Sequence, residues 1–392
     1  MILFQKRLIE NDKMKFLHVS DTHLGYSAYR KATEDGINQR EIDIYNTFEQ
    51  FIDYAISSKP DFIIHSGDLF DSVRPNNRAI TFALKQIIRL SNEKIPFFVI
   101  AGNHEHPKLK ETGHIFSIFD HLENVYPIYN AKYETYNLNI KDEKIIIHAL
   151  PQCELKSQFN NELKKIKPDS KIDYNIFLSH GAISGIQVFS MNEFNELMIP
   201  SNILSDKFDY IALGHYHKYT KIANNAFYSG SIERFTFTDA TDKKGFIENE
   251  FKNGKLKHNF IELKNRPMID SKPIKCTNLK LDEVMKKIKE TITSLEPKEK
   301  TFRITLDEIP AHIYRSLDFN EIRKISGKAI HYEIKTNLSE KDKINSNSST
   351  KLDALSNEFI QFLEGIDMEE KETILDLGLG YIEKIESRNE GK

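Results

Sequence analysis

The stretch KFLHVSDTHLG, residues 15–25, joins an apolar strand directly to an acid and an imidazole. Phe16, Leu17 and Val19 suit burial, and Asp21 and His23 follow them at once. Because these two residues are two apart, an extended chain places both side chains on one face. In layered α/β folds the carboxyl ends of strands gather ligands, so this stretch predicts a layered fold with a site at the strand end.

Four later apolar runs end in the same way. They are DFIIHSGD at 61–68, PFFVIAGN at 96–103, YNIFLSH at 174–180 and FDYIALGH at 208–215. The polar residues at or just after these ends are Asp68, Asn103, His104, His180, His215 and His217. A glycine precedes three of them, and a residue without Cβ lets the backbone turn tightly there.

These side chains are typical of a metal centre. The oxygen and nitrogen ligands, leaving His104 aside, are too many for one tetrahedral zinc. They suit two cations that share a carboxylate. A set without thiolate favours Mn²⁺, with Fe, Zn or Co as alternatives. A lone aspartate at a strand end is usually a helix cap, and a histidine inside an apolar run is usually a hydrogen-bonded core residue. We apply the second interpretation to His18, His65 and His148.

Strand and helix signals alternate over residues 14–265, which predicts an α/β layer fold. Helices are expected at 40–58 and 76–93, and a hairpin at Asn253-Gly254. A proline-containing break at 264–273 introduces a smaller α+β unit over 266–338. Residues 1–13 form an N-terminal extension, and the Ser/Asn-rich stretch 339–350 is a linker.

Residues 351–392 carry apolar side chains at helical spacing. These are Leu352, Leu355, Phe359, Phe362 and Ile366, then Ile374, Leu377 and Tyr381. Two short helices that fold back on the body are one interpretation. Because a long polar linker precedes them, we favour helices that bury this face in a partner protein.

Composition limits the class of protein. The 392 residues are 39% hydrophobic and 29% charged, with a net charge of −3. No apolar run approaches the ~18 residues of a membrane span, and the N-terminus lacks the pattern of a signal peptide. The two cysteines, Cys153 and Cys276, fit buried residues in a reducing cytoplasm. A near-neutral body still allows a local basic face for nucleic acid.

The motifs DTHLG, SGDLFD, AGNHE, LSH and LGHYHK resemble the five signatures of calcineurin-like metallophosphoesterases. DLFDSVRP and YSGSIERFTF narrow the resemblance to the nucleases of double-strand-break repair, called meiotic recombination eleven in archaea and eukaryotes and SbcD in bacteria. The resemblance implies a four-layer α-β-β-α sandwich, a small DNA-binding capping domain and C-terminal helices. It also implies a double-strand 3′-to-5′ exonuclease and single-strand endonuclease with two Mn²⁺ per subunit.

The resemblance extends to partners. It implies binding to double-stranded ends, hairpins and single strands, and a homodimer that packs through segments 76–93 and 110–123. Ordinary burial of these two segments on the sheet is the alternative. An SMC-like ABC ATPase with a coiled coil would grip the C-terminal helices, which gives a heterotetramer. The implied location is the cytoplasm, on the nucleoid. A phosphodiesterase or phosphatase for small esters and a non-catalytic DNA-end scaffold remain alternatives.

The roles of the site residues also follow from the resemblance. One cation is expected on Asp21, His23 and His217. The other is expected on Asn103, His180 and His215. Asp68 would bridge them, and His104 would donate a hydrogen bond or proton to the leaving oxygen.

One position departs from the pattern. Some relatives have a histidine three residues after the bridging aspartate, and here that residue is Asp71. It is either a cap of a turn or a partner of Arg74. Basic residues near the motifs are candidates for DNA contact or plain surface charges, namely Arg30, Lys31, Arg74 and Lys218.

Overall fold

The computed structural model describes residues 13–107, 113–185, 196–205 and 207–338, and a few residues of the C-terminal segment: 359, 371, 374, 375 and 377–379. The chain forms two compact units. The first unit comprises the chain up to Asp270 together with Lys298–Phe302 and Ala329–His331. Within this unit, the Arg266 guanidinium donates to the Glu299 carboxylate at 2.7 Å, and the Thr301 N–H donates to the Pro267 carbonyl at 3.0 Å.

The first sheet of this unit has the order β14-β13-β1-β2-β3-β4. Strands β1 to β4 run parallel, and β13 and β14 add an antiparallel hairpin to the edge of β1. Its strands are β1 (Met14–Val19), β2 (Phe62–His65), β3 (Phe97–Ile100), β4 (Val125–Ile128), β13 (Gly245–Lys252) and β14 (Lys255–Glu262). The hairpin turns at Asn253 and Gly254, both with positive φ, as the sequence predicts.

The second sheet has the order β11-β12-β10-β7-β6-β5. Its central strands are parallel, and β5 and β11 are antiparallel edges. Its strands are β5 (Glu134–Ile140), β6 (Glu143–Leu150), β7 (Tyr174–His180), β10 (Tyr210–Gly214), β11 (Thr220–Lys221) and β12 (Ala226–Tyr228). The short strands β8 (Ala182–Ile183) and β9 (Met198–Ile199) pair beside it.

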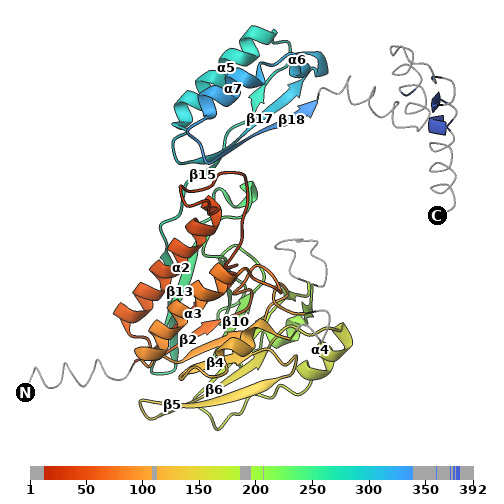
Figure 1. Ribbon diagram of the computed structural model, residues 1–392. Coiled ribbons are helices and arrows are strands. Elements are labelled where there is room, and N and C mark those ends of the chain that lie inside the picture. The colour runs from red at the N-terminus through yellow and green to blue at the C-terminus, as the bar shows by residue number, and fades with distance from the viewer. Residues whose placement is uncertain are drawn as a thin grey trace, which may run out of the picture. The chain divides into compact units, whose positions relative to one another are not determined.

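Three apolar clusters separate four layers. Phe16 and Phe98 of the first sheet and Ile147 and Tyr210 of the second belong to the cluster between the sheets. Helices α2 (Gln39–Ser58) and α3 (Asn77–Asn92) cover the outer face of the first sheet, and α4 (Lys156–Leu163) covers that of the second (Figure 1). The predicted α-β-β-α sandwich is therefore confirmed. The short 3₁₀ helices are η2 (Ile115–Phe119), η3 (Ser201–Ile203) and η4 (Phe237–Asp239).

Side-chain caps explain where the two covering helices begin. The Asn38 side chain accepts from the Arg40 N–H at the start of α2, and the Asn76 side chain accepts from the Ala79 N–H at the start of α3. Helix α2 ends at Lys59, which has a left-handed conformation. Both predicted helices are confirmed to within about two residues.

The second unit begins at Ser271 and contains the predicted sequence of strand, helix, strand, helix and strand. Its α5 buries Val284, Ile288 and Ile292 on one face. The elements here are β16 (Ile274–Lys275), α5 (Leu281–Leu295), β17 (Thr301–Ile309), α6 (Ala311–Arg315), α7 (Phe319–Ser326) and β18 (His331–Leu338), after β15 (Met268–Asp270) at the end of the first unit.

Several predicted segments lie outside the described residues. They are residues 1–12 of the N-terminal extension, the linker 339–350, and Leu352, Leu355, Phe362, Ile366 and Tyr381 of the C-terminal region. Phe359, Ile374 and Leu377 are helical. The Phe359 ring lies so close to Gly378 that a Cβ there would stand 2.1 Å from it. Among the described residues, every helix is too short or too polar to cross a bilayer.

Candidate metal centre

The loops that follow five strands meet at one edge of the two sheets. Asp21 and His23 follow β1, Asp68 follows β2, and Asn103 and His104 follow β3. From the second sheet, His180 ends β7, and His215 and His217 follow β10. Backbone hydrogen bonds tie the first two loops together: the Asp21 N–H donates to the Gly67 carbonyl at 3.0 Å and the His23 N–H to the Asp68 carbonyl at 3.0 Å.

Glycine is needed directly before these residues for two different physical reasons. Gly67 has a φ of +96°, so its backbone needs the freedom that glycine gives, as predicted. Gly102 and Gly214 do not have positive φ, and the expected tight turn is not their reason. A Cβ on Gly102 would lie 2.1 Å from Asp68 Oδ1, and one on Gly214 would lie 2.0 Å from the Ser66 carbonyl oxygen. Because Gly102 and Gly214 have no side chain, their loops can pack directly against the loop that carries Ser66 and Asp68.

Four of the predicted ligands have left-handed backbone conformations. The φ angles are 51° at Asp21, 44° at His23, 54° at Asp68 and 100° at His215. Such conformations cost of order 1–3 kcal/mol each in residues other than glycine, and they cluster at functional sites where the surroundings enforce them. The hydrogen-bonded loops therefore hold these side chains at an energetic cost to the fold.

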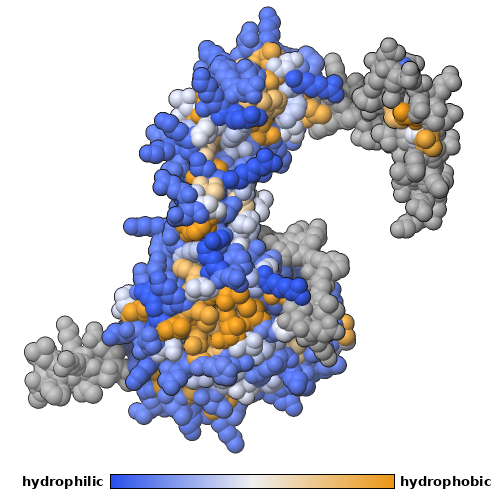
Figure 2. Space-filling view, viewed as in Figure 1, coloured by the Kyte–Doolittle hydropathy of each residue, from blue (hydrophilic) through white to orange (hydrophobic). Residues whose placement is uncertain are grey.

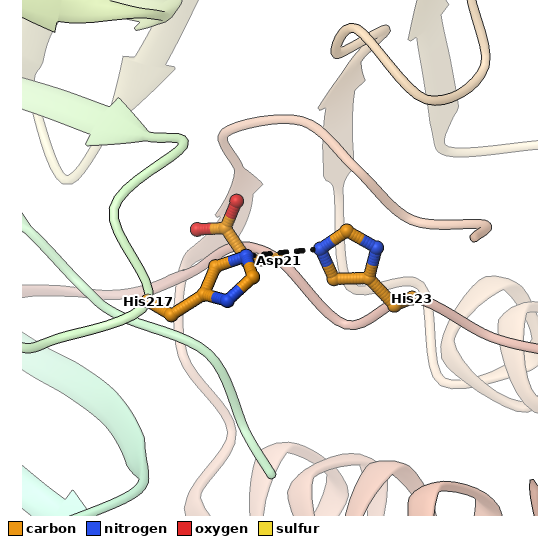
Figure 3. A group of neighbouring side chains, drawn as sticks. All are labelled: Asp21, His23 and His217. Carbon is orange, nitrogen blue, oxygen red and sulfur yellow. Dashed lines mark hydrogen bonds between the residues drawn. The ribbon is translucent and has the colours of Figure 1, made fainter. Parts of the chain in front are cut away.

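Asp21, His23 and His217 form the first group of donors (Figure 3). Their ligand atoms lie within 4.8 Å of one another, and the two Nε2 atoms of the histidines face each other at 3.2 Å. Asp21 is anchored because its Oδ1 accepts from the His215 N–H at 2.9 Å. This is the set predicted for one cation.

Asn103, His180 and His215 form a second group. Asn103 Oδ1 lies 2.9 Å from His180 Nε2 and 3.3 Å from His215 Nδ1. Asp68 stands between the groups, because its Oδ2 is 3.2 Å from His180 Nε2 and 3.8 Å from His23 Nε2. The structure therefore brings all seven predicted ligands together, with the carboxylate of Asp68 between the two groups.

The chemistry of this donor set fits divalent cations. Asp21, Asp68 and three of the four ligand histidines are almost completely buried. Burial lowers the pKa of His217 well below its usual range, so its imidazole is neutral and has a free lone pair. Burial opposes ionisation of Asp68, but His180 outweighs it and holds the pKa of this carboxyl well below its usual range. Buried carboxylate oxygens and imidazole nitrogens that converge without a thiolate suit two borderline or hard cations.

The chain is similar to known proteins in sequence. Residues 14–219 match the family model described as calcineurin-like phosphoesterase. A DNA double-strand break repair protein Mre11 from Methanococcus maripaludis is 30% identical over 356 residues, which cover 86% of this chain and 88% of the relative. The chain belongs to the Mre11 family of calcineurin-like phosphoesterases. The predicted class of enzyme, a metal-dependent phosphodiester hydrolase, is confirmed.

Two more Mre11 proteins show how far the likeness reaches. The one from Thermoplasma acidophilum is 30% identical and covers 72% of this chain and 73% of its own length. The one from Sulfolobus acidocaldarius is 33% identical, but the match covers 53% of this chain and 50% of the relative.

His104 lies beside this Mre11-family centre. Its backbone N–H donates to Asp68 Oδ1 at 3.0 Å, and its Nδ1–H donates to the Asp71 carbonyl at 2.9 Å. Burial lowers the pKa of the ring, but Asp68 and Asp71 outweigh burial and raise it. The side chain of His104 also forms a group with His23 and Asp68 in which the possible ligand atoms lie within 4.8 Å of one another.

Asp71 lies against two imidazoles rather than only capping a turn. Its Oδ1 is 3.2 Å from His23 Nδ1, and its backbone oxygen holds His104. The ring nitrogen of His23 points off the line to this oxygen, since it makes no hydrogen bond of good geometry. The Asp71 carboxylate therefore acts on His23 as a charge near Nδ1 rather than as a hydrogen-bond acceptor.

Two buried side chains that the sequence did not indicate support the ligand loops. Glu105 accepts from the Phe70 N–H at 2.7 Å and from the Gly102 N–H at 3.0 Å, and burial raises its pKa to about 8. Lys244 donates to the carbonyl oxygen of His217 at 2.7 Å, and burial lowers the pKa of its amine. Both side chains contact backbone atoms, and Phe70 and His217 are far along the chain from them, so these contacts leave no signal in the sequence.

A pocket of about 410 Å³ opens beside His23, His104 and His217. Of the basic candidates, Lys218 lines this pocket and forms an ion pair with Asp242 at 3.2 Å. Arg30, Lys31 and Arg74 are exposed. The pocket wall also holds Tyr26, Phe235, Thr236, Thr238, Asp71, Asp239 and Asp242.

Proposed function

We propose that this chain is a DNA nuclease that hydrolyses phosphodiester bonds with two divalent cations, Mn²⁺ first among them. The observation that supports it is the meeting of the carboxylate of Asp68 with six other side chains that offer oxygen or nitrogen ligands. The Mre11 relatives are DNA double-strand break repair proteins by name, which supports DNA ends as the substrate. The proposed activities are 3′-to-5′ exonuclease on double strands and endonuclease on single strands and hairpins, on nucleoid DNA in the cytoplasm.

The side chains of the chain would do the following work. Asp21, His23 and His217 would hold one cation and Asn103, His180 and His215 the other, with Asp68 between them. His180 donates its Nδ1–H to the Ser66 carbonyl at 2.8 Å, so Nε2 faces the centre and would give its lone pair to a cation bound there. Two bound cations would supply Lewis-acid stabilisation of the phosphate charge and acidify a water molecule.

His104 would act on the leaving group. Because its Nδ1–H is held by the Asp71 carbonyl, the opposite ring nitrogen is the one available to a substrate. A protonated imidazole there donates a proton or a hydrogen bond to the leaving oxygen. Burial lowers the pKa of His104, but Asp68 and Asp71 outweigh burial and raise it, which favours the protonated ring that this role needs.

Arg30, Lys31, Arg74 and Lys218 would hold the DNA backbone through its phosphates. Such contacts weaken steeply as salt rises, because each neutralised phosphate releases counterions. Lys218 lies at the pocket and is the nearest of the four to the centre by this measure. Arg30, Lys31 and Arg74 are exposed and would guide the DNA toward it.

The exposed apolar face of α3 supports a homodimer. Ile88 is 39% exposed, and Leu84 lies one turn before it, half-buried. Ile115 and Ile118 of η2 are also half-buried. Figure 2 shows an apolar patch on this side of the first unit. Burying these side chains against a second copy would remove the patch from water.

The C-terminal helices would bind an SMC-like ABC ATPase with a coiled coil, which together with the dimer gives a heterotetramer. Leu377 is 59% exposed although it is apolar and helical, which supports a partner rather than the body of the chain. A chain that ends at residue 350 should keep its nuclease activity and lose the ATPase in a pull-down. Retention of the ATPase by this shorter chain would contradict the assignment.

The nuclease assignment is tested with end-labelled duplex, hairpin and single-stranded DNA. The purified chain, stripped of metal, is titrated with Mn²⁺, and cleavage is followed on gels. We expect cleavage that depends on Mn²⁺, and a His104→Ala variant that still binds Mn²⁺ but does not cleave. Release of phosphate from a small aryl phosphate much faster than DNA cleavage would instead support the small-ester enzyme. Metal binding without any hydrolysis would support the scaffold.

A further inference from the structure

A carboxylate holds the outer nitrogen of one proposed ligand. Glu196 Oε1 lies 3.1 Å from His215 Nε2 in a well-formed hydrogen bond. The other ring nitrogen, Nδ1, faces Asn103 Oδ1 at 3.3 Å, on the side of the proposed second cation. The His215 side chain is 2% exposed and that of Glu196 is 24% exposed, so the bond is shielded from bulk water.

The backbone around Glu196 is fixed by its neighbours. Leu197, the next residue, offers its carbonyl to the Ala182 N–H at 2.9 Å, and the Ser184 N–H donates to the Ile199 carbonyl at 2.8 Å. These bonds join β8 to β9 directly after His180. A Cβ on Gly181 would lie 2.6 Å from the Leu197 oxygen, so the two segments are in close contact.

The carboxylate favours the tautomer of His215 that a cation needs. A neutral imidazole carries one proton, and a cation bound at Nδ1 uses the lone pair of that nitrogen. The proton then lies on Nε2, where the carboxylate of Glu196 is a stronger acceptor than the amide oxygen of Asn103 that faces Nδ1. His180, in the same group, is held in the same way at its outer nitrogen, but by the Ser66 carbonyl.

We propose that Glu196 is a positioning residue that sets the tautomer and ring orientation of His215 and thereby raises the affinity of the second cation. The inference rests on the proposed metal centre and deepens it. Glu196 is not itself a ligand here, since its bonded oxygen lies at the ring nitrogen opposite to the one that faces Asn103. Such outer partners of a ligand histidine are typically worth 10–100-fold in metal affinity.

The test uses the full chain with Glu196→Ala and Glu196→Gln, and Glu93→Ala as a control because Glu93 is exposed at the end of α3. Mn²⁺ binding is measured by calorimetry. Glu196→Ala should weaken one of two binding events about 10–100-fold and leave the other unchanged. Glu196→Gln should stay close to the wild type, because its amide oxygen accepts the same hydrogen bond.

A second measurement works without metal. In the metal-free chain labelled with ¹⁵N-histidine, nitrogen shifts should show the proton of His215 on Nε2, and Glu196→Ala should change this signal. Unchanged binding and an unchanged tautomer in Glu196→Ala would overturn the proposal. Equal weakening by Gln and Ala would also overturn it, because it would make Glu196 a ligand. A wild type that binds no pair of cations would refute the metal centre instead, and the tautomer would still test Glu196.

Discussion

Removal of the Glu105 side chain should destabilise the fold and the metal centre together. The carboxylate is fully buried and accepts from two backbone donors, the Phe70 N–H at 2.7 Å and the Gly102 N–H at 3.0 Å. A buried N–H left without a partner costs about 1–3 kcal/mol. Glu105→Ala leaves two, so the free energy of unfolding should fall by about 2–6 kcal/mol. Domains of ordinary stability have about 5–15 kcal/mol in total.

Glu105→Ala should also disturb the positions of two proposed metal ligands. Phe70 lies two residues after Asp68, and Gly102 directly before Asn103, so Glu105 joins the two loops that carry them. Without this link the distance between Asp68 and Asn103 is no longer held. We therefore expect weaker Mn²⁺ binding in Glu105→Ala even where the variant is fully folded.

The assay is urea unfolding followed by circular dichroism, with EDTA present so that bound metal adds no stability. Glu105→Gln keeps one acceptor and turns an amide N–H₂ toward the other donor, so about half the loss is expected, about 1–3 kcal/mol. Glu93→Ala, at an exposed site, should change stability by less than about 0.5 kcal/mol. A loss below about 1 kcal/mol in Glu105→Ala would refute the reasoning.

Burial lowers the pKa of His18 to about 3, whereas an unfolded histidine takes up a proton below about 6.5, so stability should fall by about 2 kcal/mol between pH 7 and pH 5 on account of this residue. His18→Gln should lose less over that range in urea titrations, and an equal loss would contradict the assignment. Gly102→Ala places a Cβ against Asp68 and should lower kcat about 100-fold, while Gly327→Ala, where nothing lies closer than 3.3 Å, should leave it unchanged. Ile88→Lys should turn the proposed dimer into a monomer in sedimentation equilibrium, and an intact dimer would place the interface elsewhere.

The meeting of the seven proposed ligands could be predicted from the sequence because each of them follows an apolar run. Asp68 and His215 come directly after strands of different sheets, and parallel strands that end at one edge bring such residues together. The same reasoning distinguished His18 and His148 from the proposed ligands, because these two histidines lie inside strands. His18 bonds Tyr210 and Ser66, and His148 bonds Tyr133 and Asn175, as expected of core histidines.

The supporting side chains could not be predicted in this way. Glu105 and Lys244 act on backbone groups, and any residue can supply those. Glu196 precedes a two-residue strand too short to give a periodic signal, and its partner His215 is 19 residues away. Asp71 was expected at a turn. Its contact with His23 involves the left-handed backbone conformation of His23, which no sequence propensity indicates.

The discontinuous make-up of the first unit bears on how the chain folds as it leaves the ribosome. Residues 298–302 belong to this unit but are synthesised after residues 271–297 of the second unit, and residues 329–331 follow residues 303–328 of that unit. At about 5–20 residues per second, the segment from 271 to 331 takes about 3–12 s to emerge. During that interval Pro267 lacks the Thr301 N–H and Arg266 lacks Glu299, although every proposed ligand has already been made. A nascent chain is thus expected to assemble the loops of the proposed metal centre first. The first unit is complete only after residues 329–331 have been synthesised.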